Sequence, residues 1–185
     1  MAAALVLGLG FFTYLMTRIG KQAPAWVAAP EIVLALSLYR GLACYGEIPH
    51  GAFFLCLTGL FCALTDIFAY LVGSRFGRHK LAPKVSPGKS IEGALGGLGI
   101  TVVLIVLVFG RFFDDIGTLV LYTAVVSILG QFGDLSMSAV KRVAGVKDFG
   151  HIFPGHGGIL DRCDSLMYPL AFTWLLYCAQ IWIFV

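Results

Sequence analysis

Acidic and basic residues alternate in one stretch of the chain, DFGHIFPGHGGILDRCDS, which lies between two strongly apolar regions. Its aspartates are Asp148, Asp161 and Asp164, and the cations in and near it are Lys141, Arg142, Lys147 and Arg162. Carboxylate oxygens are the ligands that Mg²⁺ prefers, whereas lysine and arginine neutralise phosphates. The pattern therefore predicts a site for a divalent cation and a polyphosphate.

Glycines and a histidine complete this stretch. Gly157 and Gly158 follow His156 in GHGG, and glycine allows a backbone to approach a phosphate as an anion-binding nest. A lone histidine is more often structural than a ligand, and zinc is disfavoured because no second Cys or His stands at ligand spacing. The alternative is a solvated loop whose charges pair with each other, but that loop would not need so many glycines and acids.

Two more aspartates, Asp66 and Asp134, fall inside apolar segments. A carboxylate within a membrane span costs about 2.5–3.5 kcal/mol on insertion scales, so it normally faces a cavity, a partner or an ion. For Asp66, solvation at the membrane interface explains the residue equally well. For Asp134, the neighbouring Gly130 and Gly133 favour close approach of a ligand or another helix.

The segment KLAPKVSPGKSIEGALGG ends a charged loop and contains GKS, the tail of a phosphate-binding P-loop. The rest of that motif fails, because Pro83 stands where a glycine is required. Lys84, Lys89 and Ser90 are spaced to contact a phosphate. Taken alone, the segment slightly favours the alternative, in which Ser90 and Glu92 form a capping box and the lysines only set orientation.

The composition indicates an integral membrane protein. The 185 residues are 59% hydrophobic and 12% charged, whereas soluble domains carry about a quarter charged residues. The spacing of the cysteines indicates neither a disulfide framework nor a zinc site. The apolar N-terminal segment is interpreted as a membrane span and not as a signal peptide, because a signal peptide has positive charge before its apolar run and this segment has none. We predict a single all-α polytopic membrane domain over 1–185, with a polar cavity open to the cytoplasmic side. Its six helices are expected at 2–17, 25–45, 51–73, 93–110, 116–136 and 166–185.

Loop charges set the orientation. If all six helices cross the membrane, the loops after the first, third and fifth share one face, and these hold most of the 13 Lys and Arg residues. The opposite loops, GEIPH and RFFDD, are nearly neutral or acidic. By the positive-inside rule the basic face is cytoplasmic and both termini lie outside.

Three motifs resemble one known family. The stretch from Ser138 to Asp164 reads S-x-x-K-R-x₄-K-D-x-G-x₂-F-P-G-H-G-G-x-x-D-R-x-D, which resembles the signature of CDP-diacylglycerol synthases (phosphatidate cytidylyltransferases). D-x-x-A-Y-x-x-G at Asp66–Gly73 and S-P-x-K-S-x-E-G at Ser86–Gly93 resemble further blocks of that family. The resemblance covers roughly residues 60–166. Residues 1–50 differ from the family pattern, because typical members carry more N-terminal helices. This shorter N-terminal region would be expected of a fragment of a longer protein.

The resemblance implies transfer of CMP from CTP to phosphatidate, giving CDP-diacylglycerol and pyrophosphate. It ties Asp134 and Asp161 to Mg²⁺, with room for a second cation. The catalytic residues expected are Asp134, Lys147, Asp161, Arg162 and Asp164. The substrate-binding residues expected are Asp66, Lys89, Ser90, Ser138, Lys141, Arg142, His156, Gly157 and Gly158. The expected partners are CTP, phosphatidate and membrane lipid, with no nucleic acid and with a homodimer allowed, in a bacterial-type cytoplasmic membrane.

Three other classes of membrane protein are alternatives to this function. A CDP-alcohol phosphotransferase needs D-G-x₂-A-R-x₈-G-x₃-D-x₃-D, and no such run is present. A CTP transferase acting on an ether lipid would use similar residues. A transporter could also carry carboxylates in its spans, but it would not explain the GHGG cluster.

Overall fold

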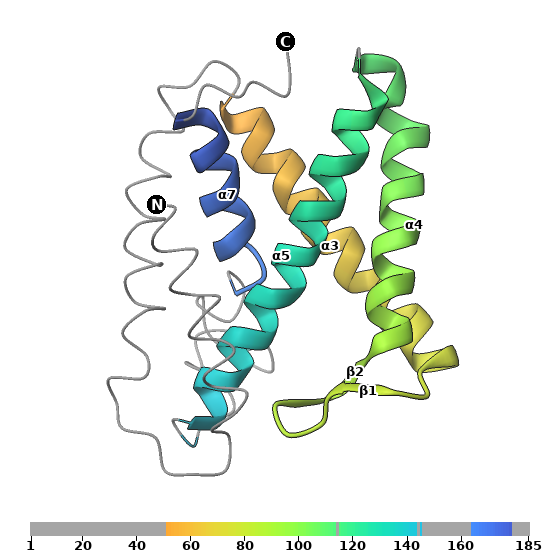
Figure 1. The fold of residues 1–185 in the computed structure, drawn as a ribbon, viewed down its shortest axis with the longest axis vertical. Coiled ribbons are helices and arrows are strands. Elements are labelled where there is room, and N and C mark those ends of the chain that lie inside the picture. Colours follow the sequence, from red (N-terminus) through yellow and green to blue (C-terminus); the bar gives the residue numbers. More distant parts are fainter. Residues whose placement is uncertain (1–50, 114, 144, 146–163, 179–185) are drawn as a thin grey trace, which may run out of the picture.

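The computed structural model describes residues 51–113, 115–143, 145 and 164–178 of the protein. These residues form a small bundle of helices with one β-hairpin at its end (Figure 1). The predicted helices at 2–17 and 25–45 lie outside the described residues.

Three helices are long and apolar enough to cross a membrane, and they correspond to the predicted spans at 51–73, 93–110 and 116–136. They are α3 (Gly51–Phe76), α4 (Ile91–Phe109), which the short 3₁₀ helix η2 (Gly110–Phe112) extends, and α5 (Ile116–Val143). A shorter apolar helix, α7 (Met167–Cys178), covers the described part of the predicted last span. These helices indicate an integral membrane protein.

The described chain is mostly helical, as predicted, but the all-α expectation needs a correction at residues 80–90. There β1 (Lys80–Ala82) and β2 (Ser86–Ser90) pair antiparallel, with Lys80 opposite Ser90 and Ala82 opposite Ser86. Pro83 occupies the second position of the connecting turn, in which the Val85 N–H donates to the Ala82 carbonyl oxygen at 3.1 Å. Proline presets the backbone for that position, so the sequence favours a turn where a plain loop was expected.

Basic residues lie at one end of the bundle: Arg75 in the last turn of α3, Lys80 on the hairpin, and Lys141 and Arg142 in the last turn of α5. The C-terminal ends of α3 and α5, the hairpin and the start of α4 are all found there (Figure 1). At the opposite end, the Asp115 carboxylate begins α5 by accepting hydrogen bonds from the backbone N–H groups of Gly117 and Thr118, at 2.9 and 3.1 Å. The hydroxyl of Thr118 and these N–H groups hold the pKa of Asp115 below its usual value.

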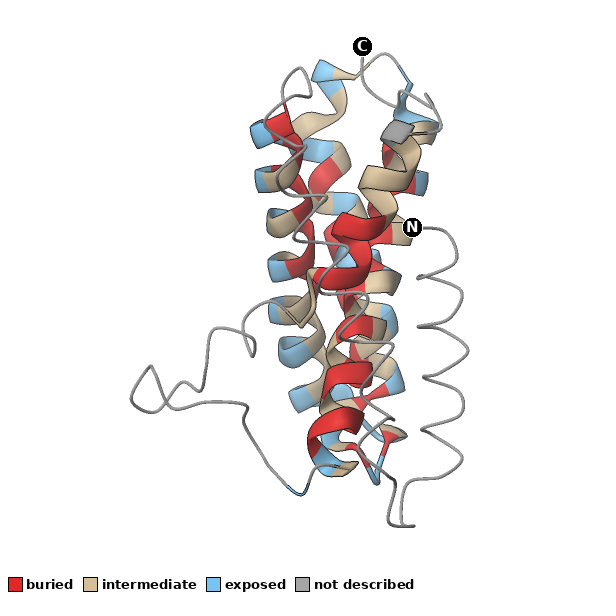
Figure 2. Ribbon diagram, turned by 90° about the vertical axis from the view of Figure 1, so that its left-hand side faces the viewer, coloured by how far each residue is buried: buried red, intermediate tan, exposed pale blue. Residues whose placement is uncertain are grey.

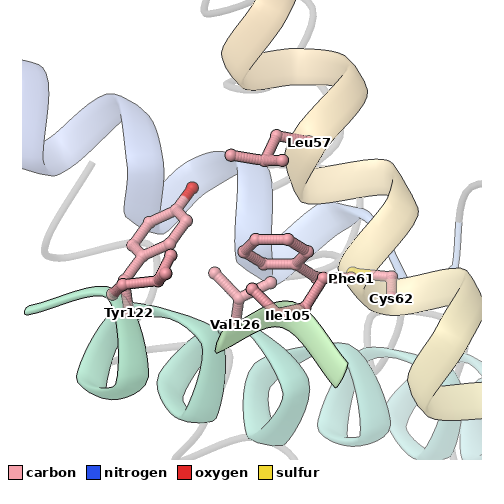
Figure 3. Packing of buried hydrophobic residues seen from close by; sticks show 7 residues of the cluster. Leu57, Phe61, Cys62, Ile105, Tyr122 and Val126 are labelled. Atoms are coloured by element: carbon pink, nitrogen blue, oxygen red, sulfur yellow. The ribbon is translucent and has the colours of Figure 1, made fainter. Parts of the chain in front are cut away.

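The core lies where α3, α4 and α5 meet. Phe61 of α3, Ile105 of α4 and Tyr122 of α5 are at most 2% exposed and converge with their neighbours in one cluster (Figure 3). Buried residues follow the inner sides of the helices, and exposed ones follow the outer sides (Figure 2). Large apolar side chains on those outer sides are suited to contact lipid.

Small and hydroxylated residues allow the helices to approach closely. Gly97 of α4 packs on the backbone of α3 at Thr65 and Ala69. The buried Thr65 hydroxyl donates to Ser127 Oγ of α5 at 2.8 Å, and lies 3.4 Å from Thr101 Oγ1 of α4. Such contacts join helices inside a membrane, where apolar burial alone gives little drive for association.

Candidate active site

A cavity of about 430 Å³ lies near the basic end of the bundle. Its walls come from the C-terminal half of α3, the hairpin, the start of α4 and the later part of α5. The residues that line it are Asp66, Ala69, Tyr70, Gly73, Ser74, Leu81, Ser86, Gly88, Lys89, Ser90, Ala94, Gln131 and Asp134. Four residues predicted for the site, from four different elements or their ends, therefore share one cavity: Asp66, Lys89, Ser90 and Asp134.

Lys89 and Asp134 form an ion pair in this cavity. The Lys89 ammonium contacts Asp134 Oδ2, and both side chains are about a quarter exposed, at 26% and 28%. One turn further along α5, the Ser138 hydroxyl lies 3.5 Å from Asp134 Oδ1, as the i, i+4 spacing allows. The structure thus brings the predicted residues Lys89, Asp134 and Ser138 together.

Ser90 caps α4, as the capping alternative predicts. Its side-chain oxygen accepts a hydrogen bond from the Gly93 N–H at 3.1 Å, and the residue is 5% exposed. The glutamate half of the predicted capping box is wrong, because Glu92 stands one position too early in the helix. Its carboxylate instead accepts hydrogen bonds from the backbone N–H groups of Arg78 and His79, at 3.1 Å each. Glu92 therefore joins the base of the hairpin to α4.

Asp164 and Lys141 form a second, more buried pair beside the cavity. The Lys141 ammonium lies 3.4 Å from Asp164 Oδ2, and the two side chains are 10% and 13% exposed. Burial raises the pKa of the Asp164 carboxyl to about 6, the charge of Asp134 adds to the rise, and Lys141 opposes it. A Cβ at Gly133 would collide with the Asp164 carbonyl oxygen, so this glycine lets the segment approach α5.

Arg142 contacts the hairpin. Its Nε–H donates to the backbone carbonyl oxygen of Val85 at 3.2 Å, on the turn between β1 and β2. The predicted contact of Arg142 with substrate phosphates stays a prediction.

The other predicted site residues are Lys147, His156, Gly157, Gly158, Asp161 and Arg162, and they lie outside the described residues. The proposed pairing of Asp134 with Asp161 stays a prediction. Among the residues that the structure describes, no three His, Cys, Asp or Glu side chains gather closely enough to hold a metal ion.

The sequence was compared with protein families and with curated proteins. Residues 1–179 match the family described as "Cytidylyltransferase family". Among curated relatives, a protein of Staphylococcus haemolyticus (strain JCSC1435) named "Phosphatidate cytidylyltransferase" is 47% identical over 128 residues, which are 68% of this chain and 49% of the relative. Proteins with the same name from Staphylococcus saprophyticus and Staphylococcus aureus (strain COL) are 36% and 38% identical over 170 residues, which are 89% of this chain and 65% of each relative.

The chain belongs to the cytidylyltransferase family. The resemblance that the sequence motifs carry is thereby confirmed. The chain spans about half to just under two thirds of the length of these curated relatives. The relatives do not favour the ether-lipid enzyme or the transporter.

The carboxylates in the cavity supply oxygen atoms of the type that a hard divalent cation prefers. Two carboxylates, those of Asp66 and Asp134, line the cavity together. Oxygen ligands of this kind suit Mg²⁺, and Lys89 balances part of their charge. These two carboxylates of the cytidylyltransferase are of the chemical type that the implied metal prefers, but without a third such side chain among the described residues they do not form a metal site by themselves.

Sequence reasoning missed two residues that line the cavity. Gln131 of α5 donates from Nε2 to the Ala94 carbonyl oxygen at 3.2 Å, and so connects α5 to the first turns of α4. A polar amide inside an apolar span was the signal that could have found it. Tyr70 of α3 is 75% exposed and stands in the motif D-x-x-A-Y-x-x-G.

Proposed function

We propose that this cytidylyltransferase transfers CMP from CTP to phosphatidate, giving CDP-diacylglycerol and pyrophosphate. A phosphate oxygen of phosphatidate attacks the α-phosphorus of CTP, and the bond from that phosphorus to the α–β bridging oxygen breaks. The bridging oxygen leaves with pyrophosphate. The attacking oxygen is already anionic at neutral pH, so no strong general base is required.

One observation carries the proposal: Lys89 and Asp134, from segments far apart in the chain, meet in a cavity that Asp66 also lines. The difficulty of the reaction is to bring two polyanions together in line, which calls for positioning and fixed charge more than covalent catalysis. Lys89 would bind and orient a phosphate at the cavity wall. Ser138 would hold the Asp134 carboxylate in place.

Mg²⁺ is the cofactor we propose, with Asp134 and Asp161 as its protein ligands. When bound, it would offset negative charge on the CTP phosphates. Asp164 would add negative potential near these ligands, and its pairing with Lys141 limits that effect. Lys147 and Arg162 are proposed to neutralise phosphates, and His156, Gly157 and Gly158 to line their path.

We further propose that the cavity faces the cytoplasm in a bacterial-type cytoplasmic membrane. Arg75 ends α3, Lys89 lies on the hairpin, and Lys141 and Arg142 end α5, so these cations lie at the end of the bundle near the cavity, which supports this orientation. Phosphatidate would reach the cavity from the surrounding membrane, and CTP from the aqueous side.

The test is release of pyrophosphate by the purified protein with CTP, phosphatidate and Mg²⁺. Asp134→Asn keeps the side chain's size but removes its charge, and should lower turnover on the order of a hundredfold or more. Asp115→Asn is the matched control, because it makes the same change at the opposite end of the bundle and asparagine also caps helices. Wild-type turnover by the Asp134→Asn variant would refute the site. Turnover only with an ether-linked lipid would refute the substrate, and CTP-independent flux would indicate a transporter.

A further inference from the structure

The hairpin that carries Lys89 is anchored to α5 through its turn. Val85, at the end of the turn, is fully buried at 0% exposed, and Ala82 beside it is 1% exposed. Both pack in one cluster with residues of the C-terminal half of α5, which are Leu135, Ala139 and Val140. The Arg142 Nε–H adds a hydrogen bond of 3.2 Å to the Val85 carbonyl oxygen.

The base of the hairpin is attached to α4. The Ile91 N–H donates to the His79 carbonyl oxygen at 2.9 Å, and Glu92 accepts from the N–H groups of Arg78 and His79. A two-stranded hairpin is marginally stable by itself. Its position therefore depends on these attachments at the base and on the anchor at Val85.

Lys89 lies on β2 between the two attachments. Lys89 comes four residues after Val85 in the turn and directly before Ser90, which caps α4. From this position the Lys89 ammonium contacts the Asp134 carboxylate. If the turn leaves α5, β2 loses its fixed direction, and the distance from Lys89 to Asp134 is no longer set.

We propose that Arg142 is a positioning residue, which acts on the reaction by holding the hairpin so that Lys89 stays at Asp134. This inference rests on the proposed function. It differs from the sequence expectation that Arg142 binds a phosphate directly. A guanidinium binds phosphate best through two parallel N–H groups, and the side-on pair that includes Nε is not available while Nε donates to Val85.

The first test measures the hairpin without measuring activity. Lys84 is exposed on the turn, so trypsin can cut after it once the turn opens. Cleavage of a transiently open segment follows the population of its open form. Arg142→Gln should speed cleavage after Lys84 by about fivefold, the factor that corresponds to one hydrogen bond. Arg111→Gln, the same change at an exposed site on the opposite end, should leave this rate unchanged.

Two further variants separate the hydrogen bond from the charge. Arg142→Lys keeps the positive charge but has no N–H at the Nε position, so it should speed cleavage as Arg142→Gln does. Val85→Ala keeps the carbonyl acceptor but removes buried methyl groups, so it should also speed cleavage. Wild-type cleavage in both Arg142 variants would overturn the proposal.

The second test is a double-mutant cycle between Arg142 and Lys89 in the pyrophosphate assay. If Arg142 acts through Lys89, Arg142→Gln should lower turnover about tenfold in the wild-type background and less than about twofold in Lys89→Gln, because coupled residues are not additive. An equal fold-loss in both backgrounds would show an independent role, such as direct phosphate binding, and would overturn the proposal. If the wild type releases no pyrophosphate, the proposed function fails, while the trypsin comparison still decides whether Arg142 holds the hairpin.

Discussion

Replacing Gly97 by alanine should weaken the junction of α3 and α4. A Cβ at position 97 would lie 2.7 Å from the backbone nitrogen of Ala69 and 2.7 Å from the carbonyl oxygen of Thr65. Both atoms belong to the backbone of α3, so they cannot rotate away as the end of a flexible side chain would. The helices would have to move apart.

The expected magnitude is the balance of two effects. Overpacking a close contact costs about 1–3 kcal/mol. Alanine is a better helix former than glycine, which returns up to about 1 kcal/mol. After subtraction of about 1 kcal/mol for helix propensity, the free energy of unfolding should fall by up to roughly 2 kcal/mol.

Gly99 offers a matched control on the same helix. A Cβ there would meet nothing within 4 Å, so Gly99→Ala gains helix propensity without a collision. Its free energy of unfolding should stay the same or rise by up to about 1 kcal/mol. The two variants change the same atoms two residues apart, and only one of them faces α3.

The assay is unfolding of the purified protein by titration with a denaturing detergent in mixed micelles, with helix content followed by circular dichroism. The Gly97→Ala transition should come at a lower detergent fraction than the Gly99→Ala transition. If the two variants unfold together, the close packing of α3 on α4 does not limit stability, and the reasoning from the collision at position 97 is wrong.

Three further outcomes follow from the same contacts. Thr65→Val should lower the free energy of unfolding by about 0.6–1.7 kcal/mol in the same titration, because Ser127 loses its partner, and no change would mean that the bond is not stabilising. On a cysteine-free background, Lys84→Cys should be labelled only from the cytoplasmic side and Arg111→Cys only from outside, and the reverse pattern would overturn the orientation. Lys89→Met should lower pyrophosphate release on the order of a hundredfold, whereas wild-type turnover would remove this ammonium from the site.

Hydropathy along the sequence predicted the helices that the structure describes. The starts of α3 and α5 agree with the predicted spans at 51–73 and 116–136, although both helices run past the predicted ends. This works because hydropathy is a property of consecutive residues, and a membrane requires about 20 of them in one helix. The motifs that resemble the family were likewise visible as residue types at fixed spacing.

The ends of the helices were harder to predict. α5 continues to Val143, beyond the apolar residues, so Ser138 and Lys141 lie on a helix and not in a loop. Lys141 and Arg142 are charged but do not end α5 early, because the hairpin packs against this part of the helix. The cap at Ser90 was predictable, because its hydroxyl serves a backbone N–H only three residues away.

The partners of the charged residues were decided by tertiary structure. The sequence predicted phosphate contacts for Lys89 and Lys141, which stay predictions, and it did not predict that Lys89 pairs with Asp134 and Lys141 with Asp164. The sequence shows that these charges exist, but which of them meet depends on how the hairpin and the segment before α7 lie against α5.

The hairpin is the clearest case. Pro83 was enough to predict a turn, but the sequence did not predict that the hairpin positions Lys89. Val85 is buried only because α5 passes beside it, and Arg142 reaches its carbonyl only from the last turn of that helix. Residue types and spacing along the chain thus determined the membrane helices, the family and the candidate groups. The packing of the helices and the hairpin decided which groups share the cavity, because the contacts that assemble it join residues far apart in the chain.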